Sequence, residues 1–279
     1  MKGLAYALLA VSLPALAADY TVTKEESLER RFSFSGGAKR EFVLKNVNGG
    51  IRVTPSSGND LVMSVKTRWR AESQAKLDEA RRDVQLKIEE GAAGVRVCLE
   101  TGCNCGENRW SRVMRGYDFR HEFELQAPKD VVLRLSTVSG DIALDHTAGG
   151  FELNTVNGRV EMTEISGSGR AYALNGGVKA SFTANPAEKS YFGSLNGKVE
   201  IAFAPGFAAK AMLKSFNGSF YSDFPVTPVA AAPEPGRREG DRWVYRSRGY
   251  RAVQIGSGGP EIQFETFNGD VHILSREKR

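Results

Sequence analysis

The chain has 279 residues, of which 41% are hydrophobic and 25% are charged, enough for one or two domains with a sizeable core. Its net charge of +5, from 38 Lys and Arg against 33 Asp and Glu, is a mild excess. This charge does not single out nucleic acid as a partner. It would not oppose binding to an acidic polymer of a cell envelope.

Residues 1–17 have the pattern of a secretory signal peptide. Lys2 precedes an apolar run from Leu4 to Leu13, and Ala15 and Ala17 form an A-x-A cleavage site. The run is shorter than the about 20 residues that cross a bilayer, and no later segment is long or apolar enough. We therefore expect cleavage before Ala18 and a periplasmic or secreted protein that is not an integral membrane protein.

Residues 18–135 contain long alternating segments such as REFVLKNV and VVLRLSTV, which predict β-strands. One stretch differs, because residues 71–83 place Ala71, Ala75, Leu77 and Ala80 on one stripe among charged residues. We expect a short surface helix there. The whole region is interpreted as a β-rich cap over the open end of the region that follows.

The three cysteines, Cys98, Cys103 and Cys105, lie together in CLETGCNC. With His121 they have the residue types of a zinc site, but an exported protein meets oxidants. We expect a disulfide from Cys98 to either Cys103 or Cys105, and the odd count leaves one thiol over. No metal or cofactor is expected.

A short phrase recurs seven times, beginning at residues 45, 136, 154, 172, 193, 214 and 265, and NTVNGRVEMTE is one example. The position before Asn or Ser is apolar in every copy, and so is the second position after the invariant Gly. Successive glycines from Gly140 to Gly218 are 18, 18, 21 and 21 residues apart, a period typical of repeat architectures. The recurring pairs are Asn48 and Gly49, Ser139 and Gly140, Asn157 and Gly158, Asn175 and Gly176, Asn196 and Gly197, Asn217 and Gly218, and Asn268 and Gly269.

Two architectures fit this phrase: a meander with a hairpin at each Asn-Gly, or a β-solenoid in which Asn-Gly is a stacked corner. In a hairpin, the apolar residue before Asn would share a face with the residue after Gly, which is polar or Gly in every copy. That mismatch favours the corner. We therefore predict an all-β, solenoid-like region over residues 136–279, with stacked Asn side chains and a left-handed Gly at each corner.

Residues 225–240 are rich in Pro and Ala and read as a loop inserted between repeat units. Basic and aromatic residues follow it and form a weak candidate surface for a sugar or polyanion. These residues are Arg242, Trp243, Tyr245, Arg246, Arg248, Tyr250 and Arg251. The ordinary interpretation is an exposed strand with long cationic side chains.

Asp141, Asp145 and His146 could serve in acid–base chemistry, and Glu161 and Glu164 lie at nearby positions of the next copy. Outward strand positions are polar in any case, so no catalytic residue is assigned.

The TVNG/TVSG phrase, the SGS-type turns and the final IGSGGPEIQFETFNGDVHI resemble a bacterial β-strand-repeat family, the putative adhesin family, a domain of unknown function. The resemblance covers roughly residues 40–275. It implies an exported or envelope-associated, β-solenoid-like domain with no established catalytic residues. CLETGCNC and the Pro/Ala-rich insertion depart from the family pattern.

The leading hypothesis is a non-catalytic, adhesin-like or scaffold protein that binds an envelope polysaccharide or an envelope protein and no nucleic acid. One alternative is a carbohydrate-active enzyme acting on an acidic polysaccharide. Another is an accessory sensor for a membrane partner. An enzyme should gather ionisable residues in one cleft, whereas a scaffold should disperse them.

Overall fold

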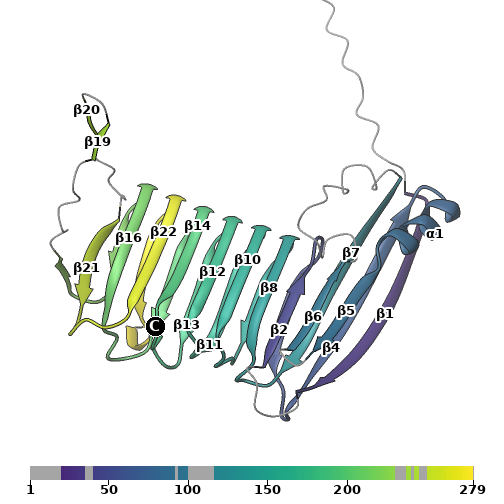
Figure 1. Cartoon of the computed structure of the whole chain (residues 1–279), viewed down its shortest axis with the longest axis horizontal. Coiled ribbons are helices and arrows are strands. Elements are labelled where there is room, and N and C mark those ends of the chain that lie inside the picture. Colours follow the sequence, from purple (N-terminus) through teal and green to yellow (C-terminus); the bar gives the residue numbers. More distant parts are fainter. Residues whose placement is uncertain are drawn as a thin grey trace, which may run out of the picture.

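The computed structural model describes residues 20–34, 40–91, 94–99, 116–229, 237–239, 242–244 and 250–278. The predicted signal peptide lies outside these ranges. The described residues form two large sheets that pack face to face, with one α-helix at the end formed by the early strands (Figure 1). The prediction of an all-β chain with a single short helix is confirmed.

The first sheet has ten strands. In spatial order they are β1 (Val22–Ser33), β4 (Asp60–Ala71), β7 (Tyr117–Ala127), β3 (Ile51–Pro55), β9 (Ile142–Asp145), β11 (Val160–Ile165), β13 (Val178–Phe182), β15 (Val199–Phe203), β23 (Val271–Ser275) and β17 (Phe220–Ser222).

The second sheet has eleven strands. In spatial order they are β18 (Val226–Pro228), β21 (Arg251–Ile255), β16 (Ala209–Asn217), β22 (Glu261–Asn268), β14 (Ser190–Asn196), β12 (Gly169–Asn175), β10 (Phe151–Asn157), β8 (Val132–Ser139), β2 (Glu41–Lys45), β6 (Gly94–Leu99) and β5 (Leu86–Gly91). A separate pair is formed by β19 (Arg237–Glu239) and β20 (Arg242–Val244), and a 3-10 helix, η2 (Arg276–Lys278), follows β23.

Each copy of the phrase contributes one strand to the second sheet and, after Asn-Gly or Ser-Gly, one strand to the first sheet. Successive copies pair in parallel and in register: Asn157 lies opposite Asn175, and Val160 lies opposite Val178. A hairpin at Asn-Gly would require antiparallel pairing of the two flanking strands. The parallel pairing therefore excludes the meander for these copies.

The spatial order of the copies differs from their order along the chain. Strand β22 of the last copy lies between β14 and β16, and β23 lies between β15 and β17. After the sixth copy the chain runs out to the edge strands β18 and β21, then returns between the fifth and sixth copies. The spacing of glycines along the sequence carries no information about this return.

The first copy stacks directly on the second, because β2 pairs with β8 and β3 pairs with β9. Beyond it, the long strands β1, β4 and β7 pair antiparallel and extend the first sheet. The helix α1 (Gln74–Asp83) packs on this end, where Ser73 caps it by accepting a hydrogen bond from the backbone N–H of Lys76. Leu77 and Ala80 of its apolar stripe are buried, whereas Ala71, predicted to lie on the same stripe, is the last residue of β4, so the helix starts later than predicted.

The core lies between the sheets. The second position after Gly is buried in six of the seven copies: Ile51, Ile142, Val160, Val178, Val199 and Val271. Larger rings fill the later part of the stack, where Phe192 lies 5.9 Å from Phe264 and Phe182 lies 5.4 Å from Phe203 between centroids. Because side chains alternate across a strand, the remaining positions of these strands point to solvent.

The corners are held by three contacts that repeat from copy to copy. Side-chain amides form a ladder in which Asn175 donates to Asn157 at 3.0 Å and Asn196 donates to Asn175 at 2.9 Å. It continues through Asn268 to Asn217. Two positions before Asn, hydroxyls point inward and donate to glycine carbonyls of the neighbouring copy: Thr137 to Gly49, Thr155 to Gly140, Ser194 to Gly176 and Thr266 to Gly197.

The third contact explains the invariant glycine. A Cβ atom at Gly158 would lie 2.0 Å from the carbonyl oxygen of Gly140, and one at Gly197 would lie 2.2 Å from that of Gly176. The prediction that Gly158 and Gly197 adopt left-handed backbone is wrong, because neither has φ in that region. Close approach of stacked backbones requires glycine at these corners.

Gly158→Ala should therefore destabilise the protein by about 1–3 kcal/mol or more, since the added methyl group has no space to occupy. Gly58→Ala is the matched control, because no atom lies within 4 Å of its Cβ position, and its effect should stay within about 0.5 kcal/mol. Thermal and urea unfolding would measure both. Equal stability of the two variants would contradict the close-approach explanation.

His121 is buried between the two sheets of the early strands, with 2% of its surface exposed. Its Nδ1 lies 2.8 Å from the hydroxyl of Thr67, and the rings of Trp69, Phe119 and Phe123 surround it. No partner for Nε2 is present among the described residues. Burial lowers the pKa of His121 from 6.5 to about 4, so the imidazole is neutral at pH 7.

The lowered pKa predicts acid sensitivity with a definite sign. The unfolded chain takes up a proton at His121 near pH 6.5, whereas the folded chain does so only near pH 4. The stability that the protein has with His121 neutral is fully present above pH 6.5. As the pH falls toward 4, the free energy of unfolding decreases by roughly 2–3 kcal/mol, because only the unfolded chain binds the proton in this range. In urea unfolding at pH 7 and pH 4.5, His121→Gln should lose less stability on acidification than the parent. His272→Gln, at a partly exposed position, should behave as the parent, and identical pH dependence in all three proteins would refute the assignment.

Candidate functional site

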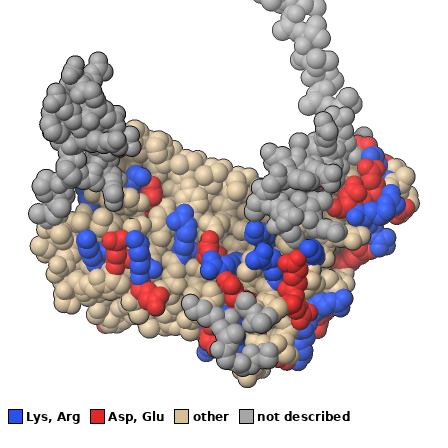
Figure 2. Space-filling view, in the orientation of Figure 1, with Lys and Arg blue, Asp and Glu red and all other residues tan. Residues whose placement is uncertain are grey.

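An apolar row runs across the outer face of the second sheet, formed by the residue before Asn or Ser in six successive strands. From β8 to β16 in spatial order, these residues are Val138, Val156, Leu174, Leu195, Phe267 and Phe216. The exposed fractions are 43% for Val138, 36% for Val156, 43% for Phe267 and 74% for Phe216. Figure 2 shows the charged side chains of this face in a middle band, with uncharged surface toward the strand ends.

The row ends in a stacked pair of phenylalanine rings, the phenylalanine platform. The rings of Phe216 and Phe267 stack with centroids 4.7 Å apart and an angle of 2° between their planes. Their strands β16 and β22 are neighbours in register, which holds the rings face to face. Phe216, the outer ring of the pair, is 74% exposed, so it can accept another flat apolar surface.

Beside the platform, Glu265 is the centre of a hydrogen-bond cluster. It accepts from Tyr250 Oη at 2.6 Å, from Tyr191 Oη at 3.2 Å and from Lys214 Nζ at 2.7 Å. Burial acts to raise the pKa of Glu265, but the hydrogen bonds from Lys214 and Tyr250 outweigh it and leave the pKa below its ordinary value. Burial and the adjacent carboxylate raise the pKa of Tyr191 to about 12. Glu265 is therefore an ionised acceptor whose partners are already in place.

Gly193 makes room for Tyr191. Gly193 lies in register between Tyr172 and Glu265, and the Tyr191 ring folds over it: a Cβ at Gly193 would lie 2.5 Å from Tyr191 Oη. The missing side chain lets the Tyr191 hydroxyl reach Glu265 one strand away. Glycine in a strand interior often marks such a close approach.

Arg170 lies on the faces of two tyrosines. Its guanidinium carbon is 4.0 Å from the centroid of the Tyr191 ring and 5.5 Å from that of Tyr172. These geometries are cation–π contacts. Among the described residues, no Asp or Glu lies within ion-pair distance of Arg170. Its neighbour in the register, Glu152, pairs with Arg134 instead.

These features line one groove of about 460 Å³. Arg170, Tyr172 and Tyr191 form one side, Lys214 and Glu265 lie beside them, and Phe216 and Phe267 form the apolar end. The groove thus combines an exposed cation, tyrosine rings and an open aromatic platform. Such a mixture suits recognition of a ligand that has both apolar faces and polar edges.

The sequence-predicted sugar or polyanion surface is only partly placed in the structure. Tyr250 joins the Glu265 cluster, and Arg251 is exposed at the start of β21. Arg242 and Trp243 begin β20, whose side chains are not described, and Tyr245, Arg246 and Arg248 lie outside the described residues. Whether the segment acts as one surface stays a prediction.

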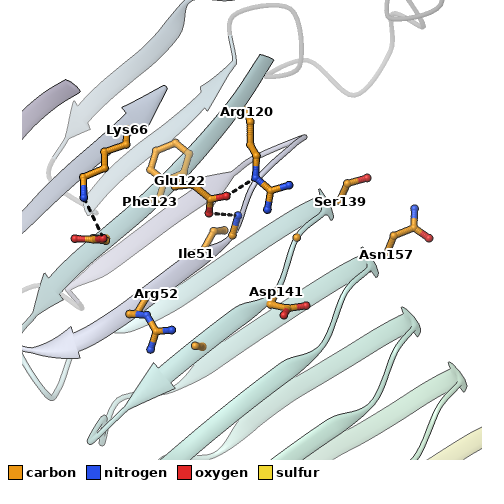
Figure 3. Close-up of a pocket in the computed structure, with 13 residues that line it drawn as sticks. Ile51, Arg52, Lys66, Arg120, Glu122, Phe123, Ser139, Asp141 and Asn157 are labelled. Atoms are coloured by element: carbon orange, nitrogen blue, oxygen red, sulfur yellow. Dashed lines mark hydrogen bonds and ion pairs between the residues drawn. The ribbon is translucent and has the colours of Figure 1, made fainter. Parts of the chain in front are cut away.

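A second hollow, of about 670 Å³, lies where the early strands meet the repeat (Figure 3). Of its carboxylates, Glu124 pairs with Lys66 at 3.7 Å, and the other two accept hydrogen bonds from the backbone. Glu122 pairs with Arg120 and accepts from the N–H of Gly50 at 2.7 Å, and Asp141 accepts from the N–H of Arg159 at 2.7 Å. Asp270 does the same for Ser219 at 2.8 Å. These acids tie one copy to the next, so their presence in a hollow has a structural explanation.

The structure brings Asp145, His146 and Glu164 together but leaves Asp141 at the other end of β9. His146 Nδ1 lies 2.7 Å from Asp145, and Nε2 lies 2.7 Å from Glu164. Glu164 also pairs with Arg276 at 3.0 Å, which fastens η2 to the middle of the stack. His146 and Glu164 have φ of 51° and 53°, unusual for residues other than glycine. Both ring nitrogens are engaged, which fits a structural tie. Glu161 pairs separately with Lys179 at 4.0 Å.

Cys98 is buried at the end of β6, whereas Cys103 and Cys105 lie outside the described residues. Its disulfide therefore stays a prediction. Among the described residues, no group of three His, Cys, Asp or Glu side chains is arranged to hold a metal ion. In the same part of the chain, no helix is long and apolar enough to cross a membrane.

Sequence reasoning missed Arg170, Tyr172, Tyr191 and Glu265 as site residues. Their signal was present, since each lies two or four positions before the apolar residue of the phrase, on the outward side of its strand. The sequence does not show which copies become neighbours in space. In particular, it does not show that β22 of the last copy lies next to β14.

No family model matches this chain, and no curated protein matches it. Among solved structures, it is similar to a putative cell adhesion protein from Clostridium sporogenes ATCC 15579, with a TM-score of 0.47 and 11% identity over 91% of this chain and 100% of that one. A putative adhesin from Bacteroides fragilis NCTC 9343 has a TM-score of 0.41 and 10% identity over 90% and 97%. A putative lipid binding protein from Parabacteroides distasonis ATCC 8503 has a TM-score of 0.29 and 10% identity over 90% and 96%.

One of these structures is named a putative adhesin and another a putative cell adhesion protein, in line with the resemblance that the sequence motifs suggested.

Proposed function

We propose that this chain is an exported, non-catalytic β-solenoid protein with an adhesin-like role, which binds a component of the cell envelope through the outer face of its second sheet. Each repeat unit is one coil of the solenoid. The antiparallel strands β1, β4 and β7 and the helix α1, all within residues 18–135, cap one end of the stack. The repeat region of residues 136–279 supplies the binding face.

The apolar row is the observation that carries this proposal. In each copy that forms it, the corner is held by the Asn ladder, by an inward hydroxyl or by both, so packing does not require an apolar side chain between these positions. The residue there is nevertheless apolar in each of these copies and remains partly or largely in solvent. Contiguous apolar surface of this kind is typical of interaction sites.

The groove beside the row favours binding over hydrolysis. A general acid for glycoside cleavage needs a carboxyl group with a raised pKa. Glu265, the carboxylate of the groove, has a lowered pKa and accepts from three side chains. As an ionised acceptor, Glu265 holds Tyr191, Tyr250 and Lys214 in position. This supports a binding role over the alternative of a carbohydrate-active enzyme.

The double variant Phe216→Ser with Phe267→Ser should bind envelope at least tenfold more weakly than the parent, because it removes the platform. The measurement is co-sedimentation of the mature protein with envelope isolated from the producing cell. Tyr221→Ser is the control, since Tyr221 is an exposed aromatic residue on the first sheet. Unchanged co-sedimentation of the double variant, with its melting temperature preserved, would contradict the proposal.

Export is a separate part of the proposal and rests on the signal peptide pattern. Protein recovered from the producing cell should begin at Ala18, because residues 1–17 carry the cleavage site. Intact-mass measurement of the periplasmic and secreted fractions would locate the N-terminus. A functional form that retains Met1 would be inconsistent with export by this route.

A further inference from the structure

We propose that the groove beside the apolar row binds a carboxylate-bearing sugar unit of an acidic polysaccharide, with the carboxylate on Arg170 and the sugar rings against the phenylalanine platform. This inference rests on the proposed function and specifies the partner of the same face.

The charge of the groove favours an anion. Lys214 is neutralised by Glu265 at 2.7 Å, whereas Arg170 has no carboxylate partner among the described residues. Two cations and one anion leave the groove with one uncompensated positive charge. Arg134, on the same face, shows the contrast because it pairs with both Glu41 and Glu152. The planar guanidinium of Arg170 presents donors in the geometry that a carboxylate accepts in a bidentate manner.

The tyrosines hold Arg170 ready for such a ligand. Its position over the Tyr191 and Tyr172 rings orients the guanidinium without using its hydrogen-bond donors. Tyr191 is itself fixed by its hydrogen bond to Glu265 and by the space over Gly193. Less conformational freedom is then lost on binding, which favours affinity. The Tyr172 hydroxyl has no hydrogen-bond partner among the described residues and can serve a sugar hydroxyl.

The platform favours a sugar over a simple anion. A pyranose ring has a face of C–H bonds that packs on an aromatic ring, while its hydroxyls remain at the edge for hydrogen bonds. Phe216 and Phe267 offer two stacked rings with parallel planes at the apolar end of the groove, and Phe216 keeps 74% of its surface exposed for such a contact. From there the apolar row continues at the strand spacing of about 4.8 Å, so a polymer lying across the strands meets a similar side chain on each one.

The test uses the mature full-length chain and isothermal titration with hexagalacturonate, a hexasaccharide with one carboxylate per unit. The parent should bind hexagalacturonate in a salt-dependent manner and should bind neutral maltohexaose at least tenfold more weakly. Arg170→Gln should weaken hexagalacturonate binding at least tenfold and reduce its salt dependence. Phe216→Ser should weaken it several-fold, and both variants should keep the parent melting temperature because both side chains are exposed.

Arg159→Gln is the matched control, because it removes the same charge from an exposed position outside the groove and should leave binding unchanged. Absence of hexagalacturonate binding, equal binding of maltohexaose, or an Arg170→Gln variant that binds as the parent would each overturn the inference. Tighter binding of a short polyphosphate than of hexagalacturonate would overturn it in favour of a phosphate polymer.

The two proposals fail separately. If hexagalacturonate does not bind but the Phe216→Ser and Phe267→Ser variant still loses envelope binding, the sugar assignment is wrong and the binding face stands. If envelope binding is insensitive to that double variant, the proposed function is wrong whatever the sugar does.

Discussion

The contact between stacked backbones at the corners is the constraint on which the rest of the structure depends. The carbonyl of one glycine lies where the next glycine would carry its Cβ, so the chain can turn there only with hydrogen as the side chain. The backbone hydrogen bonds of the parallel strands hold the copies about 4.8 Å apart, and only glycine fits at the corner at that separation. At that separation the asparagine amides reach one another and the inward hydroxyls reach the glycine carbonyls of the neighbouring copy. At the corners of the stack, the glycine contact is thus joined by an amide of the ladder, by an inward hydroxyl or by both.

The same constraint decides which side chains face a partner. Because the residue two positions before Asn or Ser points inward, alternation turns the next residue outward, and this next residue is apolar in every copy. A regular corner therefore aligns these apolar side chains in one row on the outer face, although the corner itself does not require them to be apolar. Differences between the copies create the groove at one end of this row. Two copies have phenylalanine in the row, and a third has Gly193 at an outward position, over which the Tyr191 ring folds.

Charge on this molecule serves two purposes that the structure separates. Asp141, Asp270 and Glu122 accept hydrogen bonds from the backbone of an adjacent copy, and Glu164 joins His146 to Arg276. These carboxylates and the imidazole strengthen the stack, and their hydrogen-bond and ion-pair partners explain why charged residues occur at these positions. Arg170 is different, because it is exposed, held by aromatic rings and without a carboxylate partner among the described residues. A cation kept in that state is better suited to an external anion than to stability.

The sequence by itself determined the strands of the repeat, a short helix, the Asn ladder and the need for glycine at the corners, because each follows from local periodicity. It placed the start of the helix three residues too early, since Ala71 ends β4, and it missed the short strands β18 and β19 within residues 225–240. It also separated the parallel stack from the meander through the mismatch of residues around Asn-Gly. It misjudged the reason for Gly158, since a close approach between copies cannot be read from one copy alone. Only the tertiary structure decided that β22 lies between β14 and β16, and this placement brings Glu265 to Tyr191 and Phe267 to Phe216. Those pairs are 74 and 51 residues apart, and no pattern within a single repeat unit records which units become neighbours in space.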